Sequence, residues 1–239
     1  MLKSFLNMGA YKHIIYRGVS DCSFKLLSSI GRRGHPIDKL EQIERSMLEE
    51  YKKTIDIQQA LKFKLENINE DLFFLSNARH MGLDCRLLDW TVSRDVATLF
   101  AICDENNLDK TAAIWVLEIP SDYLDRHQYK YNTMNPFQNE DVLRIIKMDF
   151  YGDSFRDSPE AEKRRLMQNS IFTLTKTELV NTPLEDIDLG DIKLFVAEYL
   201  NPKMKQNYIK KHASFIEKHK LPPVTQKVID INQKYAKQS

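Results

Sequence analysis

Apolar residues recur at helical spacing along several stretches of the chain. The first helix should begin near Asp38, which can cap it after Pro36. The second should cover residues 71–80 and end at Gly82, where glycine permits a left-handed turn. Ser93 is a good N-cap for a third helix, whose expected buried side consists of Val96, Leu99, Phe100 and Cys103. Further helices are expected at residues 54–69, at residues 158–168 and in two segments after Pro202.

Short runs rich in β-branched and aromatic residues predict strands between these helices. The runs are residues 13–16, 112–119, 143–150, 170–175 and 192–200. Gly18 should end the first strand by turning the chain, and residues 80–91 should form a rigid connection between two helices. The pattern predicts a single mixed α+β domain, with a central sheet of short strands flanked by helices. We expect its core at about residues 13–208 and a helical C-terminal tail at about 209–239.

The composition suits a folded protein and narrows the classes of partner. Of the 239 residues, 42% are hydrophobic, and 35 basic residues face 34 acidic ones, so the net charge of +1 gives no support to nucleic-acid binding. The segment from Asn201 onward is rich in lysine, which a solvated helix face explains better than an anionic partner. No apolar run approaches the ~18 residues of a membrane helix, and the first residues do not read as a secretory signal. We therefore expect a cytoplasmic protein without a membrane partner.

Familiar signatures of metals and cofactors are absent from the sequence. It contains no phosphate-binding loop, no GxGxxG and no HExxH, and its six histidines do not cluster at ligand spacing. Its three cysteines show no CxxC spacing, so neither a metal site nor a disulfide framework is expected. Cys85, next to Arg86, is a conceivable nucleophile, although a structural role is the simpler interpretation because no base is placed beside it.

Residues 80–91, which read HMGLDCRLLDWT, concentrate the candidate chemistry of the chain. Arg86 and Asp89 are three residues apart and opposite in charge, so they could pair and hold a turn rigid. Trp90 adds apolar area and one N–H donor, and His80 could cap the end of a helix. The same residues could build a site or only brace a loop, and the pattern by itself favours bracing.

This stretch and three other motifs resemble the FRG domain, a bacterial and phage family named for a Phe-Arg-Gly motif. The matching segments are YRG at 16–18, SFKLLSSIGRR at 23–33, ARHMGLDCRLLDWTVSRDVATLFA at 78–101 and RRLMQNSIF at 164–172. The chain departs from the family pattern at Arg79, where the family has glutamine, at Asp84-Cys85, where it has Pro-Thr, and at Asn169-Ser170. The family's closing segment has no counterpart here. The resemblance implies a setting in phage defence or bacterial conflict, and no reaction common to the family.

A strand that ends in Tyr-Arg-Gly is also similar to the first motif of ADP-ribosyltransferases, and this weaker analogy implies NAD as a substrate. It gives a catalytic set of Arg17, His80 and Glu198, with Glu118 as the second choice of carboxylate. It gives a cofactor-binding set of Tyr16, Arg17, Gly18, Arg86, Asp89, Trp90 and Gln168. The alternative is a non-catalytic module that senses a nucleotide or a phage component. In that case the same polar cluster would recognise the ligand. A purely structural interpretation is also open, in which Arg17 forms a buried ion pair with Asp89 that stabilises the fold and Glu198 is an exposed strand residue.

Each of these predictions depends on one spatial expectation. Arg17, from the first strand, must lie close to residues 80–90, so that the two segments share a polar cavity.

Overall fold

The computed structural model describes residues 12–55, 69–123, 133–147, 170–218 and 224–236. Within these residues, an antiparallel sheet has the strand order β4-β5-β2-β1-β3-β6, and helices flank it, so the predicted α+β class is confirmed. The strands are β1 (Lys12–Val19), β2 (Leu87–Thr91), β3 (Ala112–Pro120), β4 (Leu143–Lys147), β5 (Ser170–Thr175) and β6 (Lys193–Leu200). The helices are α1 (Ile37–Lys52), α3 (Glu70–His80), α4 (Arg94–Ile102), α7 (Pro202–Lys211), α8 (Ala213–Lys218) and α9 (Gln226–Ala236).

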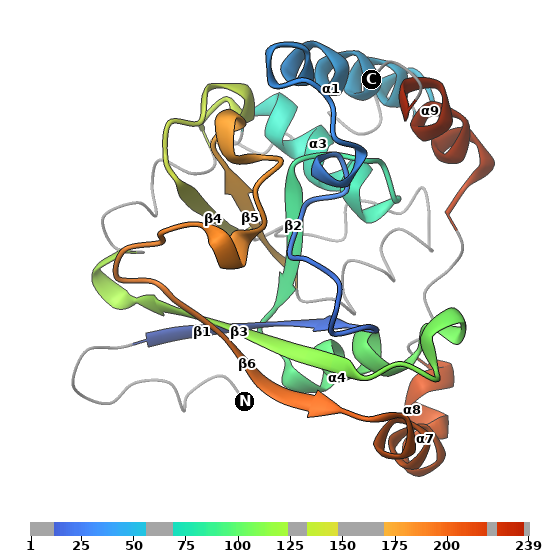
Figure 1. The fold of residues 1–239 in the computed structure, drawn as a ribbon. Coiled ribbons are helices and arrows are strands. Elements are labelled where there is room, and N and C mark those ends of the chain that lie inside the picture. The colour runs from blue at the N-terminus through green and yellow to red at the C-terminus, as the bar shows by residue number, and fades with distance from the viewer. Residues whose placement is uncertain (1–11, 56–68, 124–132, 148–169, 219–223, 237–239) are drawn as a thin grey trace.

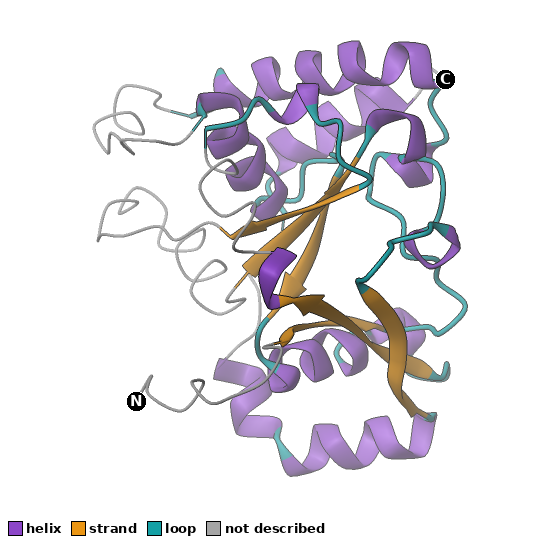
Figure 2. Cartoon of the chain, turned by 90° about the vertical axis from the view of Figure 1, so that its left-hand side faces the viewer, coloured by secondary structure: helices purple, strands orange, loops and turns teal. Residues whose placement is uncertain are grey.

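The sheet divides into two halves that meet between β1 and β2. In Figure 1, β2, β4 and β5 lie with α1, α3 and α9, whereas β1, β3 and β6 lie with α4, α7 and α8. Figure 2 shows the two groups of helices on the outer sides, with the strands between them. β1 pairs with β3 along its whole length, from Lys12 to Val19, but its register with β2 consists of one pair, Tyr16 with Thr91. The junction between the halves therefore has little backbone pairing of its own.

In the described parts of the chain, three apolar clusters fill the spaces around the sheet. The first packs α1, α3 and α9 against β2 and β5, with Phe74, Leu87 and Phe172 at its centre. The second covers the opposite face of the same strands and reaches β1 and β3, and it contains Trp90. The third packs α4 against β1 and β3. Successive strand residues point to opposite faces of the sheet, so neighbours such as Asp89 and Trp90 belong to different layers.

Most of the predicted elements are confirmed, with one important exception. The strands expected at 13–16, 112–119, 170–175 and 192–200 are present, and α3 and α4 begin within a residue of the positions expected. Gly82 has a φ of 93°, and the Ser93 side chain accepts a hydrogen bond from the Val96 N–H. However, Leu87–Thr91 is a central strand between β1 and β5 and not a connection between helices. The helix expected at 54–69 falls largely outside the described residues, and the helix expected at 158–168 falls wholly outside them.

Gly18 has a different role from the one that the sequence suggested. It lies inside β1 and does not turn the chain. A Cβ at this position would lie 1.8 Å from the carbonyl oxygen of Ala97, so α4 packs directly on the strand backbone. Glycine is needed here for the close approach of a helix and not for a special backbone angle.

Two local predictions were also wrong. Asp38 lies in the first turn of α1, whose N-cap residue is Pro36 without a side-chain cap. α4 buries Ala97, Ala101 and Ile102 and exposes Phe100 and Cys103, so its expected buried side faces outward. The C-terminal segment is helical as expected, and α9 buries Val228, Ile231 and Tyr235 in the cluster that α1 and α3 share.

Among the described residues, no helix has the length and apolar character needed to cross a bilayer.

Candidate functional site

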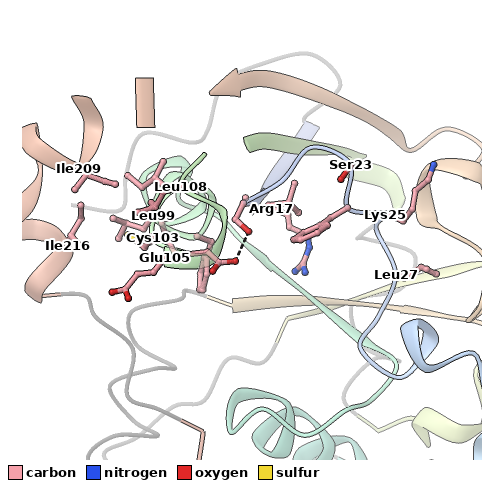
Figure 3. A pocket seen from close by; sticks show the side chains of 18 of the residues that line it. Arg17, Ser23, Lys25, Leu27, Leu99, Cys103, Glu105, Leu108, Ile209 and Ile216 are labelled. Carbon is pink, nitrogen blue, oxygen red and sulfur yellow. Dashed lines mark hydrogen bonds between the residues drawn. The ribbon is translucent and has the colours of Figure 1, made fainter. Parts of the chain in front are cut away.

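A pocket of about 1250 Å³ opens where β1 ends, between the segment that follows this strand, α4 and the α7–α8 pair. One side carries basic groups, from Arg17, Lys25 and Arg32. The other side is largely apolar and includes Leu99, Phe100, Leu108, Ile209 and Ile216, together with the carboxylates of Asp104, Glu105 and Glu217. Figure 3 shows Arg17 between these two groups, with Lys25 on one side and Leu99, Ile209 and Ile216 on the other.

Arg17 reaches from β1 to the neighbouring half of the sheet. Its Nη1 donates a 2.5 Å hydrogen bond to the main-chain carbonyl of Asp89 and lies 4.0 Å from the carboxylate of the same residue. This contact lies beside the single register pair of β1 and β2, Tyr16 with Thr91, so it stabilises the junction between the two halves of the sheet. Burial lowers the pKa of Arg17 to about 10, although the Asp89 charge opposes that shift. Its Nε is buried without a hydrogen-bond partner among the described residues.

Arg79 is the main partner of the Asp89 carboxylate. Its Nε and Nη2 donate to Asp89 Oδ2 over 2.8 and 2.5 Å, and its Nη1 donates to Ser29 over 3.1 Å. Burial alone would raise the pKa of Asp89, but the charges of Arg79 and Arg17 hold that pKa below its usual value. The charge of Arg32 also acts on Arg17. A second carboxylate, Asp84, also acts on Arg32 and Arg79 and is paired with Arg33. Among the described residues, the four arginines of this cluster thus outnumber its two aspartates, which leaves an excess of positive charge at the basic side of the pocket.

Arg86 does not pair with Asp89, contrary to the sequence-based expectation. Its Nε donates to Glu44 Oε2 over 2.6 Å, and its main-chain N–H donates to Oε1 of the same carboxylate over 2.7 Å. Its other guanidinium nitrogens bond to Thr177 and to the Pro136 carbonyl, so the group is enclosed. Arg86 precedes β2 and turns toward Glu44 of α1, whereas Asp89 lies inside the strand and bonds to Arg79, so the pair does not form.

Trp90 and His80 are buried away from the pocket. Trp90 Nε1 donates to Thr173 over 3.0 Å on the face of β2 opposite to Asp89. The His80 ring lies 5.1 Å from the Phe172 ring at the end of α3, in a buried position. Cys85 is fully buried, and burial raises the pKa of its thiol, so Arg86 does not activate it as a nucleophile.

The remaining predicted site residues are dispersed. Gly18 lines the pocket, whereas Tyr16 packs against the α4 cluster on the other side of β1 from Arg17. Glu198 bonds to Arg94 over 2.8 Å, and neither Glu198 nor Glu118 is among the residues that line the pocket. Gln168 lies outside the described residues. Of the predicted set, the structure thus brings together Arg17, Gly18 and Asp89, and His80 is near enough for its charge to act on Asp89. Of these residues, Arg17 and Gly18 line the pocket itself.

Several residues at the site do not stand out in the sequence. Arg79 is notable there only as a departure from a family motif, yet its side chain binds Asp89. Arg32 and Lys25 lie in the FRG-like segment at residues 23–33, where nothing local distinguishes them from solvated charges. Within the described parts of the chain, no group of three or more His, Cys, Asp or Glu side chains is arranged to hold a metal ion.

Comparison with known protein families agrees with the resemblance for part of the chain. Residues 12–110 match the family model of the FRG domain. This FRG-matching region contains β1, α1, α3, β2 and α4, and with them Arg17, Arg79 and Asp89. No curated protein and no solved structure matches the chain. Glu198, Gln168 and the α7–α8 side of the pocket lie beyond the FRG-matching region.

Proposed function

We propose that this protein is a nucleotide-binding module, and that NAD is the first ligand to test. The observation that supports the proposal is the excess of guanidinium groups around Asp89, because two of them, Arg17 and Arg32, also line the pocket. Partly buried guanidinium groups that outnumber the aspartates beside them favour an anionic ligand at the basic side, while the carboxylates of Asp104, Glu105 and Glu217 line the pocket elsewhere. A guanidinium group presents its N–H donors in a fork that fits phosphate oxygens, which points to a phosphate-bearing ligand.

The rest of the pocket suits the other parts of a nucleotide. Leu99, Phe100 and Ile209 offer apolar surface for a base, whereas a bare phosphate would leave this surface uncovered. The volume of about 1250 Å³ exceeds the roughly 300–1,000 Å³ of a common small-molecule pocket, so there is room for a dinucleotide. Lys25 adds a second kind of cation on the basic side, although its ammonium already lies 3.6 Å from the carboxylate of Glu185.

The positions of the predicted catalytic residues favour binding over turnover. Glu198 is engaged by Arg94, and His80 is buried at the end of α3, so neither joins Arg17 at the pocket. We therefore place a ligand-sensing role first. The family resemblance supports phage defence or bacterial conflict as the setting of that role.

The test is a calorimetric titration of the purified protein with NAD, ADP-ribose and ATP. Replacing Arg17 by methionine should weaken binding at least about tenfold, since one charged contact is worth ~1.4 kcal/mol or more. Arg32→Met provides a second variant. Arg32 bonds to the Leu27 carbonyl and not across the β1–β2 junction, so its loss should weaken binding without disturbing that junction. Arg94→Met is the matched control, since Arg94 is an ion-paired arginine that does not line the pocket. Failure of all three ligands to bind the wild-type protein would overturn the proposal.

The second candidate function is cleavage of NAD, which is favoured by the presence of Glu105 on the pocket wall. The bond between C1′ of the ribose and the nicotinamide nitrogen would break, and its electron pair would leave with neutral nicotinamide. A carboxylate at Glu105 would stabilise the positive charge on the ribose. The oxygen of water or of an acceptor hydroxyl would then bond to C1′ and release its proton to solvent.

Nicotinamide release measures this second candidate directly. Turnover by the wild-type protein, lost in Glu105→Gln, is the expected result if cleavage occurs. Expression in bacteria gives a further comparison, in which a toxic wild type and a harmless Arg17→Ala variant would indicate catalysis. Binding of NAD without any release of nicotinamide, alone or with cell lysate, would leave the sensing role and exclude turnover under those conditions.

A further inference from the structure

Lys205 lies on α7, beyond the FRG-matching region, but its side chain bonds into that region. The residue is 0% exposed. Its Nζ donates to the main-chain carbonyls of Ser20, Asn107 and Lys110 over 2.9, 2.6 and 3.2 Å. An ammonium group has three N–H donors and no acceptor, so all of its hydrogen-bonding capacity is used in these contacts.

The three carbonyls belong to two segments that line the pocket. Ser20 follows β1, three residues after Arg17, and lines the pocket itself. Asn107 and Lys110 flank Leu108 on the apolar side. The side chains of this region are also bonded to one another, because Ser20 and Asn107 both donate to Asp104, over 2.8 and 2.7 Å. One buried ammonium therefore ties the segment that carries Arg17 to the segment that carries Leu108.

The same helix pair supplies a wall of the pocket. Ile209 lies four residues after Lys205, one turn further along the same side of α7, and Ile216 and Glu217 of α8 line the pocket as well. The position of Lys205 therefore sets how far this wall stands from Arg17.

Burying the charged ammonium of Lys205 costs free energy that packing alone does not require. Burial lowers the pKa of Lys205, and the carboxylates that act on it do so at a distance, since its direct partners are uncharged carbonyls. An apolar side chain of similar volume avoids the cost of burying a charge. What the ammonium adds is a fixed geometry among three carbonyls, which no apolar side chain supplies.

We propose that Lys205 is the positioning residue of the pocket, and that residues 202–217 complete a ligand site which the FRG-matching region only begins. The identity of the ligand rests on the proposed function above. The positioning of the α7–α8 wall by Lys205 does not depend on the proposed function, and it can be tested without a ligand.

The ligand-free test is hydrogen exchange of the full-length protein. In Lys205→Met, the amides of residues 20–27 and 104–111 should exchange at least about fivefold faster than in the wild type, because the link between the two segments is gone. Lys203→Met, which changes an exposed lysine of the same helix, should leave the amide exchange rates of both segments unchanged. Equal exchange in Lys205→Met and the wild type would overturn the proposal whatever the ligand is. If Lys205→Met does not fold, Lys205→Gln replaces it, since the amide keeps two of the three donors.

The functional test compares NAD affinity with stability. Lys205→Met should bind NAD about tenfold more weakly. A Val228→Ala variant destabilises the α9 side of the molecule and should leave the affinity unchanged, which separates positioning from a general loss of stability. In Lys205→Ala, added propylammonium should restore the affinity, whereas tetramethylammonium, which has no N–H donor, should not. Unchanged affinity in Lys205→Met would overturn the positioning role. If Lys205→Met exchanges faster but the wild-type protein does not bind NAD, NAD is not the ligand, and the positioning role of Lys205 still stands.

Discussion

Two groups of charged residues meet at β2 and differ in how completely their charges are balanced. The first is the pair of Arg86, which directly precedes β2, and Glu44. The second is the cluster of Arg17, Arg79 and Asp89. Arg86 and Glu44 have side chains that are 0% and 1% exposed, and each charge has its counterpart. In the cluster, the side chains of Arg17, Arg79 and Asp89 are 17%, 15% and 26% exposed, and positive charge is in excess.

This difference separates a structural pair from a site that can accept a ligand. A closed pair has no capacity left for another group, and its value lies in fixing α1 against β2. An open cluster with surplus donors beside a pocket can take an anion without first breaking its own contacts. Arg79 and Arg86 belong to the same FRG-like segment, residues 78–101, yet they have different roles. The surroundings of each side chain decide its role.

The largest expected effect is at the closed pair. Arg86→Met leaves the Glu44 carboxylate buried without its partner, which should lower the free energy of unfolding by about 3–5 kcal/mol. Chemical denaturation at pH 7 measures this loss. The double variant Arg86→Met/Glu44→Leu should recover much of it, because the unpaired charge is removed. A single variant within about 1 kcal/mol of the wild type would contradict the closed-pair interpretation.

An intermediate effect is expected at the open cluster, and it should depend on pH. Asp89→Asn removes the carboxylate that Arg79 and Arg17 share, at a cost of about 1–3 kcal/mol at pH 7. Because the folded protein holds the pKa of Asp89 below its unfolded value, the stability from this carboxylate is present above that unfolded pKa, at about 4, and is lost as the pH falls through the folded pKa. Unfolding curves of the wild type and the variant should therefore converge below about pH 4. A constant gap down to pH 2 would show that the charge of Asp89 is not the source of the difference.

The smallest expected effect is at the surface pair of Arg94 and Glu198. Arg94 is 57% exposed, so Arg94→Gln should change the free energy of unfolding by no more than about 0.5 kcal/mol. Ligand binding at the pocket should also be unchanged. A larger effect in either assay would mean that Glu198 contributes more than its position suggests, and it would revive that residue as a candidate carboxylate.

Part of the candidate site could be predicted because its motifs are local. Arg17 and Asp89 stand out in short motifs, and the predicted contact between their segments is present. The partners of Arg86 and Asp89 could not be predicted, since Glu44 lies 42 residues from Arg86 in the sequence and Arg79 lies on a different element from Asp89. The apolar stripe of α4 was read as core because periodicity shows that a helix has an apolar side, but not whether that side faces the interior or a pocket.

Most helices and strands of this protein could be predicted from local sequence patterns, together with the cap at Ser93 and the turn at Gly82. These follow from interactions within a few residues, which act in the same way wherever the segment lies. Long-range packing, in contrast, makes Leu87–Thr91 a central strand, encloses Arg86 with Glu44 and brings Lys205 of α7 to the segments that line the pocket. Such outcomes depend on which distant segments pack together, because burial and the pairing of charge are properties of the assembled fold.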